Sequence, residues 1–510
     1  MSATGGLLTE TAFPSKSWWA MAYVGVALLA VAVRHNSARW GFAVGSAFGL
    51  GLFLPHLWWA NEAVGQPIGW LALAIAEAGA IGVLAAAAAL VWRVPVIGTR
   101  LWLQCVSFAV LWVAVEHLRS TVPFGGFPWA TLAFSQTDSP LLRLAPLGGS
   151  TLVSFIVALI GAVLGTVITA ALSRNPATAV TGAVLCIATT SLPLLVPVST
   201  GAQTGTVNIG AVQGNVPARG AEAMSQARAV LDNHAAGTRA LLERLPAGQL
   251  DLLLWPESAS DIDPRTDQDA RAVVQAAARA AGVPIMLGTQ RFLEDTRYND
   301  YIVWEPAVGA TASYTKQHPV PFGEYIPYRD FFRRITPAVD LVRTDMTAGT
   351  DPAPIGVPIE RLGRSVPISV AICFEVAYDD LIRQSVLAGG ELIVIPTNNA
   401  SFGMTQESTQ QLAMSRFRAA EHGRAVVQVS TVGVSALIRP DGSTVDRTSL
   451  FTADQMSAQL PLRTSLTPSD RIGARLPLAV DALALVFIAG AGAHQLRGKT
   501  GRRQVGARGA

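Results

Sequence analysis

Long apolar stretches, each close to the length of a membrane-spanning helix, follow one another through the first 200 residues. A transmembrane helix needs roughly 20 mostly apolar residues to cross a bilayer. Short polar loops separate the stretches, and tryptophans gather at their ends, where amphipathic rings favour the headgroup region. A buried soluble bundle would explain one such stretch, but not six in a row. We therefore predict a membrane domain over residues 1–200, with about six spans at 17–33, 41–60, 68–92, 101–118, 147–172 and 177–198.

The pattern changes after residue 200. Between residues 205 and 465 charged residues return, and short β-rich runs alternate with stretches of helical periodicity. Such alternation is typical of an α/β domain. The expected strands are 207–212, 252–255, 283–288, 301–304, 366–372, 392–395, 425–429 and 435–438. The expected helices are 221–244, 267–281, 379–388 and 407–421.

One more apolar stretch, residues 476–494, predicts a C-terminal span, and residues 495–510 form a basic tail. Asp481 lies within this span, where a carboxylate exposed to lipid is costly. We therefore expect Asp481 to face the helical bundle or to reach the edge of the membrane.

The positions of the arginines predict the orientation, because cytoplasmic loops are enriched in Lys and Arg. The fourth loop is a weak exception, since it contains Arg119 and Arg143. Alternation places the N-terminus and residues 205–465 on the extracytoplasmic face and the basic tail in the cytoplasm. The basic residues of the first, third and fifth loops are Arg34, Arg39, Arg93, Arg100 and Arg174.

Composition agrees with a membrane protein. Half of the residues (50%) are hydrophobic and only 14% are charged, whereas soluble domains carry about 25% charged residues. The net charge of +3 gives no indication of a nucleic-acid partner. Three dispersed cysteines, Cys105, Cys186 and Cys373, do not form a disulfide framework or a zinc motif, so we expect no metal site.

Three local sequences in the α/β domain end or follow a β-rich run with a reactive side chain. They are Leu252–Glu257 (LLLWPE), Tyr314–Tyr325 (YTKQHPVPFGEY) and Ile368–Glu375 (ISVAICFE). Because α/β sheets present their sites just beyond the carboxyl ends of strands, these segments are candidates for a shared active site.

The reactive residues of these segments are Glu257, Lys316 and Cys373, the parts of a covalent acyl-transfer site. A thiolate attacks a carbonyl carbon, a carboxylate takes and returns the proton, and an ammonium stabilises the oxyanion. Each residue alone also has a structural explanation, as a helix cap, a surface lysine and a small buried hydrophobe. Spacing along the chain does not by itself show that the three meet.

The three motifs resemble those of the nitrilase (carbon–nitrogen hydrolase) superfamily, in which Glu, Lys and Cys occur in this order. The resemblance covers residues 205–465 and includes Arg416–Arg424 (RFRAAEHGR), which is similar to the superfamily's helix after the cysteine strand. It implies a nitrilase-like αββα sandwich, an α/β fold. The whole chain would then combine a multi-span α-helical membrane domain with this sandwich.

Two further features resemble one branch of that superfamily, the apolipoprotein N-acyltransferases. The string Pro319–Pro327 (PVPFGEYIP) is similar to the branch's pattern H-L-V-P-F-G-E-x-x-P. A group of residues in the membrane half resembles the loop that follows a central span in that family: Trp112, Glu116, Arg119, Gly126–Trp129 and Ser135–Gln136. The family commonly has eight spans and the first is not predicted here, so either the start is late or this member begins outside the membrane.

The resemblance implies a role for each residue of the triad. Glu257 would be the general base and acid, Lys316 the oxyanion stabiliser and Cys373 the nucleophile. The backbone N–H of Phe374 would share the oxyanion. The family uses neither metal nor cofactor.

Other matched positions leave alternatives open. Glu324 and Glu375 match family positions near the site, where they either contact substrate or hold the site by hydrogen bonds. Phe374 stands where tyrosine is common and Ser401 where tryptophan is usual. These two changes bear on lid contacts and acyl selectivity, not on the triad.

The resemblance implies an enzyme of the bacterial inner membrane that takes a fatty acyl group from a phospholipid as a Cys373 thioester. The acceptor would be the N-terminal amine of S-diacylglyceryl-cysteine in an apolipoprotein. One alternative is a membrane-tethered nitrilase-type amidohydrolase, with water as acceptor. Another is a transporter or lipid-binding protein with an inactive nitrilase-like domain, although the complete Glu-Lys-Cys set argues against this.

Overall fold

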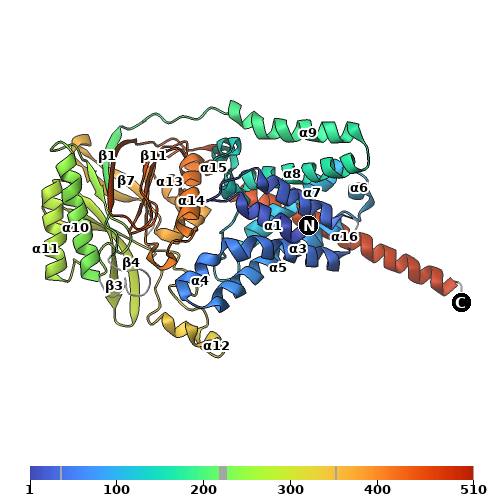
Figure 1. The fold of residues 1–510 in the computed structure, drawn as a ribbon, viewed down its shortest axis with the longest axis horizontal. Helices are drawn as coiled ribbons and strands as arrows, with labels where there is room; N and C mark the ends of the chain where they lie inside the picture. Colours follow the sequence, from blue (N-terminus) through green and yellow to red (C-terminus); the bar gives the residue numbers. More distant parts are fainter. Residues whose placement is uncertain (35–36, 217–226, 351–352, 509–510) are drawn as a thin grey trace. The chain divides into compact units, whose positions relative to one another are not determined.

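The computed structural model describes residues 1–34, 37–216, 227–350 and 353–508. The chain forms two compact units (Figure 1). A helical unit contains residues 1–197 together with the chain from Ile472 onward, and residues 198–471 form an α/β unit.

The helical unit consists of helices joined by short loops. Its α-helices are α1 (Ser2–Thr11), α2 (Met21–Val33), α3 (Ala38–His56), α4 (Trp58–Val64), α5 (Pro67–Val91), α6 (Pro95–Gly98), α7 (Leu101–Arg119), α8 (Ala145–Leu172), α9 (Pro176–Ser191) and α16 (Arg475–Arg508). Short 3-10 helices are η1 (Leu132–Gln136), η2 (Pro140–Leu144) and η3 (Leu192–Leu195).

Within the described residues, five helices are long and apolar enough to cross a membrane, or up to six if α3 and α4 form one span with a 50° bend. The prediction of a multi-span helical domain is therefore confirmed. The expected span at 17–33 is helical only over α2, 13 residues long. At 1.5 Å per residue such a helix rises about 20 Å, short of the roughly 30 Å hydrocarbon core.

Helix α1 was not predicted, because its small polar residues carry no apolar periodicity. It packs closely on α3 through Gly6, where an added Cβ would lie 2.0 Å from the Phe48 carbonyl oxygen. A polar contact also anchors it to α3: the Ser2 hydroxyl donates to the Val44 carbonyl at 2.5 Å. Lys16, in the loop after α1, pairs with Glu10 of the helix at 2.8 Å. Packing through small residues brings helix backbones together inside membranes, and hydropathy does not detect it.

Buried charged side chains of α7 have polar partners within the helical unit. Arg119 donates to Glu77 at 3.0 Å, and the Glu116 carboxylate accepts from the Trp112 indole at 2.9 Å. The C-terminal span is tied to the bundle by Asp481, whose carboxylate lies 2.6 Å from the imidazole of His117 on α7. Asp481 thus faces the bundle, one of the two alternatives expected for it.

The α/β unit contains two six-stranded sheets, ordered β12-β1-β2-β3-β4-β5 and β11-β10-β9-β8-β7-β6. The strands are β1 (Thr206–Gln213), β2 (Leu252–Leu254), β3 (Ile285–Leu293), β4 (Thr296–Glu305), β5 (Gly309–Thr315), β6 (Ile355–Ile359), β7 (Arg364–Val370), β8 (Leu392–Thr397), β9 (Val426–Ser430), β10 (Ala436–Ile438), β11 (Thr444–Arg447) and β12 (Asp454–Pro461). The helices are α10 (Ala227–Arg244), α11 (Gln268–Ala281), α12 (Arg329–Arg333), α13 (Asp379–Leu387), α14 (Glu407–His422) and α15 (Pro468–Ile472), with 3-10 helices η5 (Pro337–Leu341), η6 (Glu360–Leu362), η7 (Cys373–Ala377) and η8 (Ala400–Phe402).

The sheets form a sandwich with helices outside. One apolar core contains residues of both sheets, including Leu252 and Leu254 of β2 and Val370 of β7. A second core joins the first sheet to α10 and α11 and contains Leu253, and Figure 1 shows these helices outside that sheet and α13 and α14 outside the other. Alternate residues of β2 thus enter different cores, which explains its continuous apolar run. The predicted αββα fold is confirmed.

All four predicted helices of this unit are present, and residues 221–226 of the first prediction lie outside the described residues. The eight predicted strands are the eight interior strands. The four strands missed, β5, β6, β11 and β12, are the four sheet edges.

Candidate active site

The three reactive segments converge because of the sheet topology. Strand β2 leads to Glu257 and β5 leads to Lys316, and both run in the same direction in one sheet. Strand β7 of the other sheet leads to Cys373. An added Cβ at Gly288 of β3 would lie 2.6 Å from Glu257 Cα, so glycine lets this strand pass close to the turn that carries the carboxylate.

Lys316 is the centre of the charge cluster. Its ammonium lies 2.6 Å from Glu324 and 3.6 Å from Glu257, and the lysine is 0% exposed. Burial by itself lowers the pKa of Lys316, but the carboxylates of Glu324 and Glu257 outweigh burial and raise the pKa above its usual value. Lys316 therefore stays charged, and Glu324 holds it in place.

Glu257 is buried and held by two donors. Its carboxylate accepts from the Asn299 amide at 2.6 Å and from the Asn398 backbone N–H at 2.8 Å. Its carboxyl group also hydrogen-bonds the Cys373 thiol. Burial raises the pKa of Glu257, and the Lys316 ammonium opposes this rise. A carboxyl group with a raised pKa is suited to take and return a proton near neutral pH.

Cys373 lies at a strained turn, with φ of +56°, at the start of η7. Such left-handed backbone is rare for residues other than glycine and is found at functional sites. The thiol is 8% exposed, and the Thr397 hydroxyl lies 3.3 Å from its sulfur. Burial raises the pKa of the Cys373 thiol, Glu257 raises it further, and Lys316 lowers it. The resting sulfur is therefore a neutral thiol that needs a base.

Glu375 joins the lysine loop to the cysteine turn. One oxygen accepts from the backbone N–H groups of Gln317 (2.7 Å) and His318 (2.9 Å), and the other accepts from that of Ile372 (2.6 Å). The Tyr314 hydroxyl also donates to this carboxyl group. Burial raises the pKa of Glu375 to about 7. These contacts favour the hydrogen-bonding alternative for Glu375 over direct contact with substrate.

We expect Glu375→Ala to destabilise the α/β unit, because the buried backbone N–H of Ile372 and the partly buried N–H groups of Gln317 and His318 lose their acceptor. A buried unsatisfied group costs about 1–3 kcal/mol, and water can reach the two partly buried groups, so the loss should be about 1–3 kcal/mol. Thermal unfolding of the purified variant measures it. Tyr314→Phe removes a single donor and should lower the melting temperature much less; equal melting temperatures for Glu375→Ala and the parent would contradict this role.

Phe374, where the family commonly has tyrosine, is 6% exposed. Its ring packs edge-on against Tyr378 at 5.7 Å, and Tyr378 stacks on His318 at 4.5 Å. The position is thus filled by aromatic packing. Ser401 lies in η8, directly after the buried Ala400.

No sequence motif marks Asn299, Asn398, Thr397 or Gln411 as site residues. Asn299 lies within β4 in a polar run, and Gln411 on α14, a helix of mostly polar residues that is nonetheless buried. These side chains come from both sheets and from α14, and only the packing of the two sheets against each other brings them to Glu257, Lys316 and Cys373.

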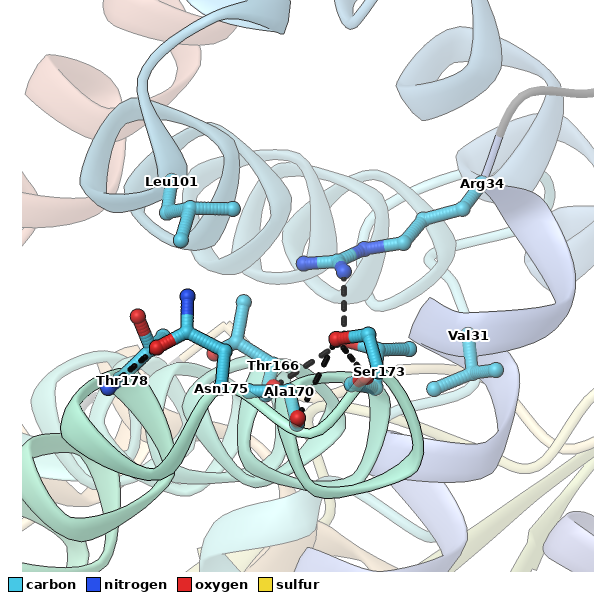
Figure 2. A pocket seen from close by; sticks show the side chains of 9 residues that line it. Val31, Arg34, Leu101, Thr166, Ala170, Ser173, Asn175 and Thr178 are labelled. Carbon is cyan, nitrogen blue, oxygen red and sulfur yellow. Dashed lines mark hydrogen bonds between the residues drawn. The ribbon is translucent and has the colours of Figure 1, made fainter.

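The helical unit contains a separate cavity of about 470 Å³ with a mixed polar and apolar lining (Figure 2). Arg34 reaches into it and donates to the Thr169 hydroxyl at 2.8 Å. The other lining residues are Val31, Leu101, Thr166, Ala170, Ser173, Asn175 and Thr178. This lining has no thiol and no carboxyl–amine pair, so it does not offer acyl-transfer chemistry. Nor do the described parts of the chain bring three His, Cys, Asp or Glu side chains into a metal-binding group.

Comparison with protein families gives two matches. Residues 5–163 match the apolipoprotein N-acyltransferase N-terminal domain. Residues 211–465 match the carbon-nitrogen hydrolase family. The second match covers the segments of all three reactive residues.

Two relatives are similar over most of their length. The apolipoprotein N-acyltransferase of Mycolicibacterium smegmatis is 39% identical over 90% of this chain and 79% of that protein. The apolipoprotein N-acyltransferase of Azotobacter vinelandii is 30% identical over 88% of this chain and 87% of that protein. Among solved structures, an amidase from Nesterenkonia sp. is 17% identical, with a TM-score of 0.37 over 52% of this chain and 94% of the amidase.

Proposed function

This chain belongs to the apolipoprotein N-acyltransferase family, and from that premise we propose that it moves a fatty acyl group from a membrane phospholipid to the N-terminal amine of S-diacylglyceryl-cysteine in lipoproteins. One observation carries the proposal. Glu257, Lys316 and Cys373 lie in one buried cluster of a carbon-nitrogen hydrolase unit, in a chain whose other unit consists of apolar helices.

In the first half-reaction, Glu257 takes the thiol proton and the Cys373 sulfur attacks the ester carbonyl carbon of the phospholipid. The oxyanion forms beside the Lys316 ammonium and the Phe374 backbone N–H. The ester C–O bond then breaks, Glu257 returns the proton to the leaving alkoxide, and a lysophospholipid departs. The acyl group remains on the sulfur as a thioester.

In the second half-reaction, the neutral amine of the lipoprotein attacks the thioester carbonyl carbon. Glu257 takes a proton from the attacking nitrogen, and the C–S bond breaks. The sulfur then regains the proton, which restores the thiol and leaves an amide on the lipoprotein. The buried position of Cys373 (8% exposed) limits the access of water, which would otherwise hydrolyse the thioester.

The products distinguish this function from that of an amidohydrolase. The purified protein, given phospholipid labelled in one acyl chain and a diacylglyceryl peptide, should yield N-acylated peptide and lysophospholipid in equal amounts. Free labelled fatty acid with an unmodified peptide would support the hydrolase instead. Family membership favours transfer, and the complete Glu-Lys-Cys set argues against an inactive domain.

We propose the inner membrane of a bacterial cell, with the α/β unit on the extracytoplasmic face. In the sequence Arg119 counts against this orientation as a basic residue of the fourth loop, but its position in the structure removes that objection. It lies at the end of α7, 6% exposed and paired with Glu77, so it is not a loop charge. The remaining fourth-loop arginine is Arg143.

Cysteine labelling tests the orientation. Asp295, in the exposed turn between β3 and β4, changed to cysteine, should react with a membrane-impermeant maleimide in intact spheroplasts. Ser173→Cys, in the exposed loop between α8 and α9, is the matched control and should react only after lysis. The reverse pattern would contradict the mechanism, because its acceptor would lie on the wrong side.

A further inference from the structure

A chain of buried polar side chains leads from α14 to the nucleophilic sulfur. Thr397 and Gln411 are 0% exposed, and Asn399 and Glu407 are 2% exposed. Buried polar groups cost free energy unless they are hydrogen-bonded. A run of four beside one sulfur atom therefore needs a reason.

The hydrogen bonds fix which way the Gln411 amide faces. Its oxygen accepts from the Asn399 amide and from the Thr397 hydroxyl, each at 2.9 Å. Its nitrogen is thereby directed at the Cys373 sulfur, 3.7 Å away. A flipped amide would set its two N–H groups against the donors of Asn399, so the network determines the orientation.

Asn399 is itself fixed at both ends. Its amide nitrogen donates to Glu407 at 2.7 Å, and its oxygen accepts from the Ser430 hydroxyl at 2.6 Å. Since an amide nitrogen has two hydrogens, Asn399 serves Glu407 and Gln411 at once. The alignment thus runs from Glu407 through Asn399 to Gln411.

Thr397 has one hydroxyl hydrogen and two neighbours that can accept it. When Cys373 is a thiol, that hydrogen can go to Gln411. When the sulfur is ionised, the hydrogen can turn to the sulfur at 3.3 Å, while Asn399 still satisfies the Gln411 oxygen. The network can therefore present two donors to a thiolate and leave no buried acceptor unsatisfied.

We propose that Gln411 is a positioning residue of the acyl transfer: its amide N–H, aligned by Asn399 and Glu407, joins the Thr397 hydroxyl in stabilising the Cys373 thiolate. This rests on the proposed function of Cys373 as the nucleophile. Hydrogen bonds to an ionised partner are roughly twice as strong as neutral ones. The donors thus favour ionisation of a thiol that burial disfavours.

The network works with Glu407 uncharged. Burial and the nearby Glu257 carboxylate together raise the pKa of Glu407 to about 8, against the hydrogen bond from Asn399. An ionised Glu407 would raise the pKa of Cys373. The charged and titratable groups around the sulfur are Glu257 and Lys316 from the first sheet and Glu407 from α14. Ionisation of Glu407 should therefore oppose formation of the thiolate.

The test measures the rate of Cys373 alkylation by iodoacetamide against pH in the full-length purified protein. Gln411→Glu keeps the shape and the acceptor oxygen but removes the donor facing the sulfur. We expect the apparent pKa of the Cys373 thiol to rise by about one unit. Such a rise lowers the thiolate fraction at pH 7, and with it the alkylation rate, about tenfold. Gln384→Glu, the same substitution at an exposed position of α13, should leave the profile unchanged.

Thr397→Val removes the other donor without changing the shape, and should shift the titration in the same direction. Should Gln411→Glu fail to fold, Thr397→Val still decides the question. Folded variants with the parent titration would overturn the proposal. Because alkylation needs no lipid, this outcome is distinct from failure of the acyl-transfer function, which would appear as transfer that persists in Cys373→Ala.

Glu407→Gln tests independently whether ionisation of Glu407 slows the alkylation of Cys373 above pH 8. The amide oxygen can still accept from Asn399, but the group no longer ionises. We expect Cys373 in this variant to alkylate faster than the parent above pH 8, and the parent profile to show an inflection near that pH which the variant lacks. Identical profiles above pH 8 would overturn the role assigned to Glu407.

Discussion

Cys373→Ala should abolish acyl transfer, lowering its rate by roughly 10⁶-fold, the loss that removal of a covalent nucleophile can cause. The reason is that, among the residues that the structure describes, Cys373 is the thiol beside Glu257 and Lys316. Transfer of a labelled acyl chain to a diacylglyceryl peptide measures the loss.

The other two cysteines are matched controls. Cys105 lies on α7 and Cys186 on α9 of the helical unit, and Cys105→Ala and Cys186→Ala should retain the parent rate. Cys373→Ser should be far weaker than the parent, because a serine hydroxyl is much harder to deprotonate than a thiol and Glu257 is a weak base. If Cys105→Ala lost activity while Cys373→Ala kept it, Cys373 could not be the nucleophile.

Lys316→Met should slow thioester formation by about 10²–10³-fold, the usual loss for one oxyanion donor. The ammonium meets a negative charge that develops only in the transition state, so the affinity for phospholipid should change little. Rapid-mixing measurement of acylation, beside equilibrium binding of a fluorescent phospholipid, separates the two effects.

Removing the buried Lys316 leaves Glu257 and Glu324 near each other without their shared cation. The folding of Lys316→Met is therefore checked by thermal unfolding before its kinetics are compared. Lys16→Met changes the same residue type in the helical unit, where Lys16 pairs with Glu10, and should leave acylation at the parent rate. A folded Lys316→Met protein with parent acylation kinetics would refute the oxyanion role.

The fold could be predicted where burial shapes the sequence. Interior strands such as β8, buried throughout, are covered on both faces, and each of the eight contains an apolar run that the sequence shows. Edge strands pair on one side only: β11 is exposed throughout and polar, whereas β6 is apolar but short and contains a glycine and a proline. Their identity depends on the neighbouring strand, which no local pattern records.

The site divides in the same way. Glu257, Lys316 and Cys373 follow β-rich segments within distinctive motifs, so the sequence predicts them as candidate site residues. Asn299 and Gln411 act through partners 42 and 38 residues away in the chain, and their surroundings in sequence resemble those of any strand or helix. The similarity to known families predicts the chemistry, whereas the hydrogen bonds that tune it require the structure.

Trapping of the covalent intermediate tests the central claim most directly. The purified protein is incubated with phospholipid labelled in one acyl chain, with no acceptor, and Cys373 is examined by peptide mass spectrometry. We predict one acyl group on Cys373, released by neutral hydroxylamine and transferred to the amine of a diacylglyceryl peptide added afterwards. Two results would contradict the thioester mechanism: labelled peptide formed by the Cys373→Ala variant, or labelled peptide formed by the parent enzyme without any acyl group appearing on Cys373.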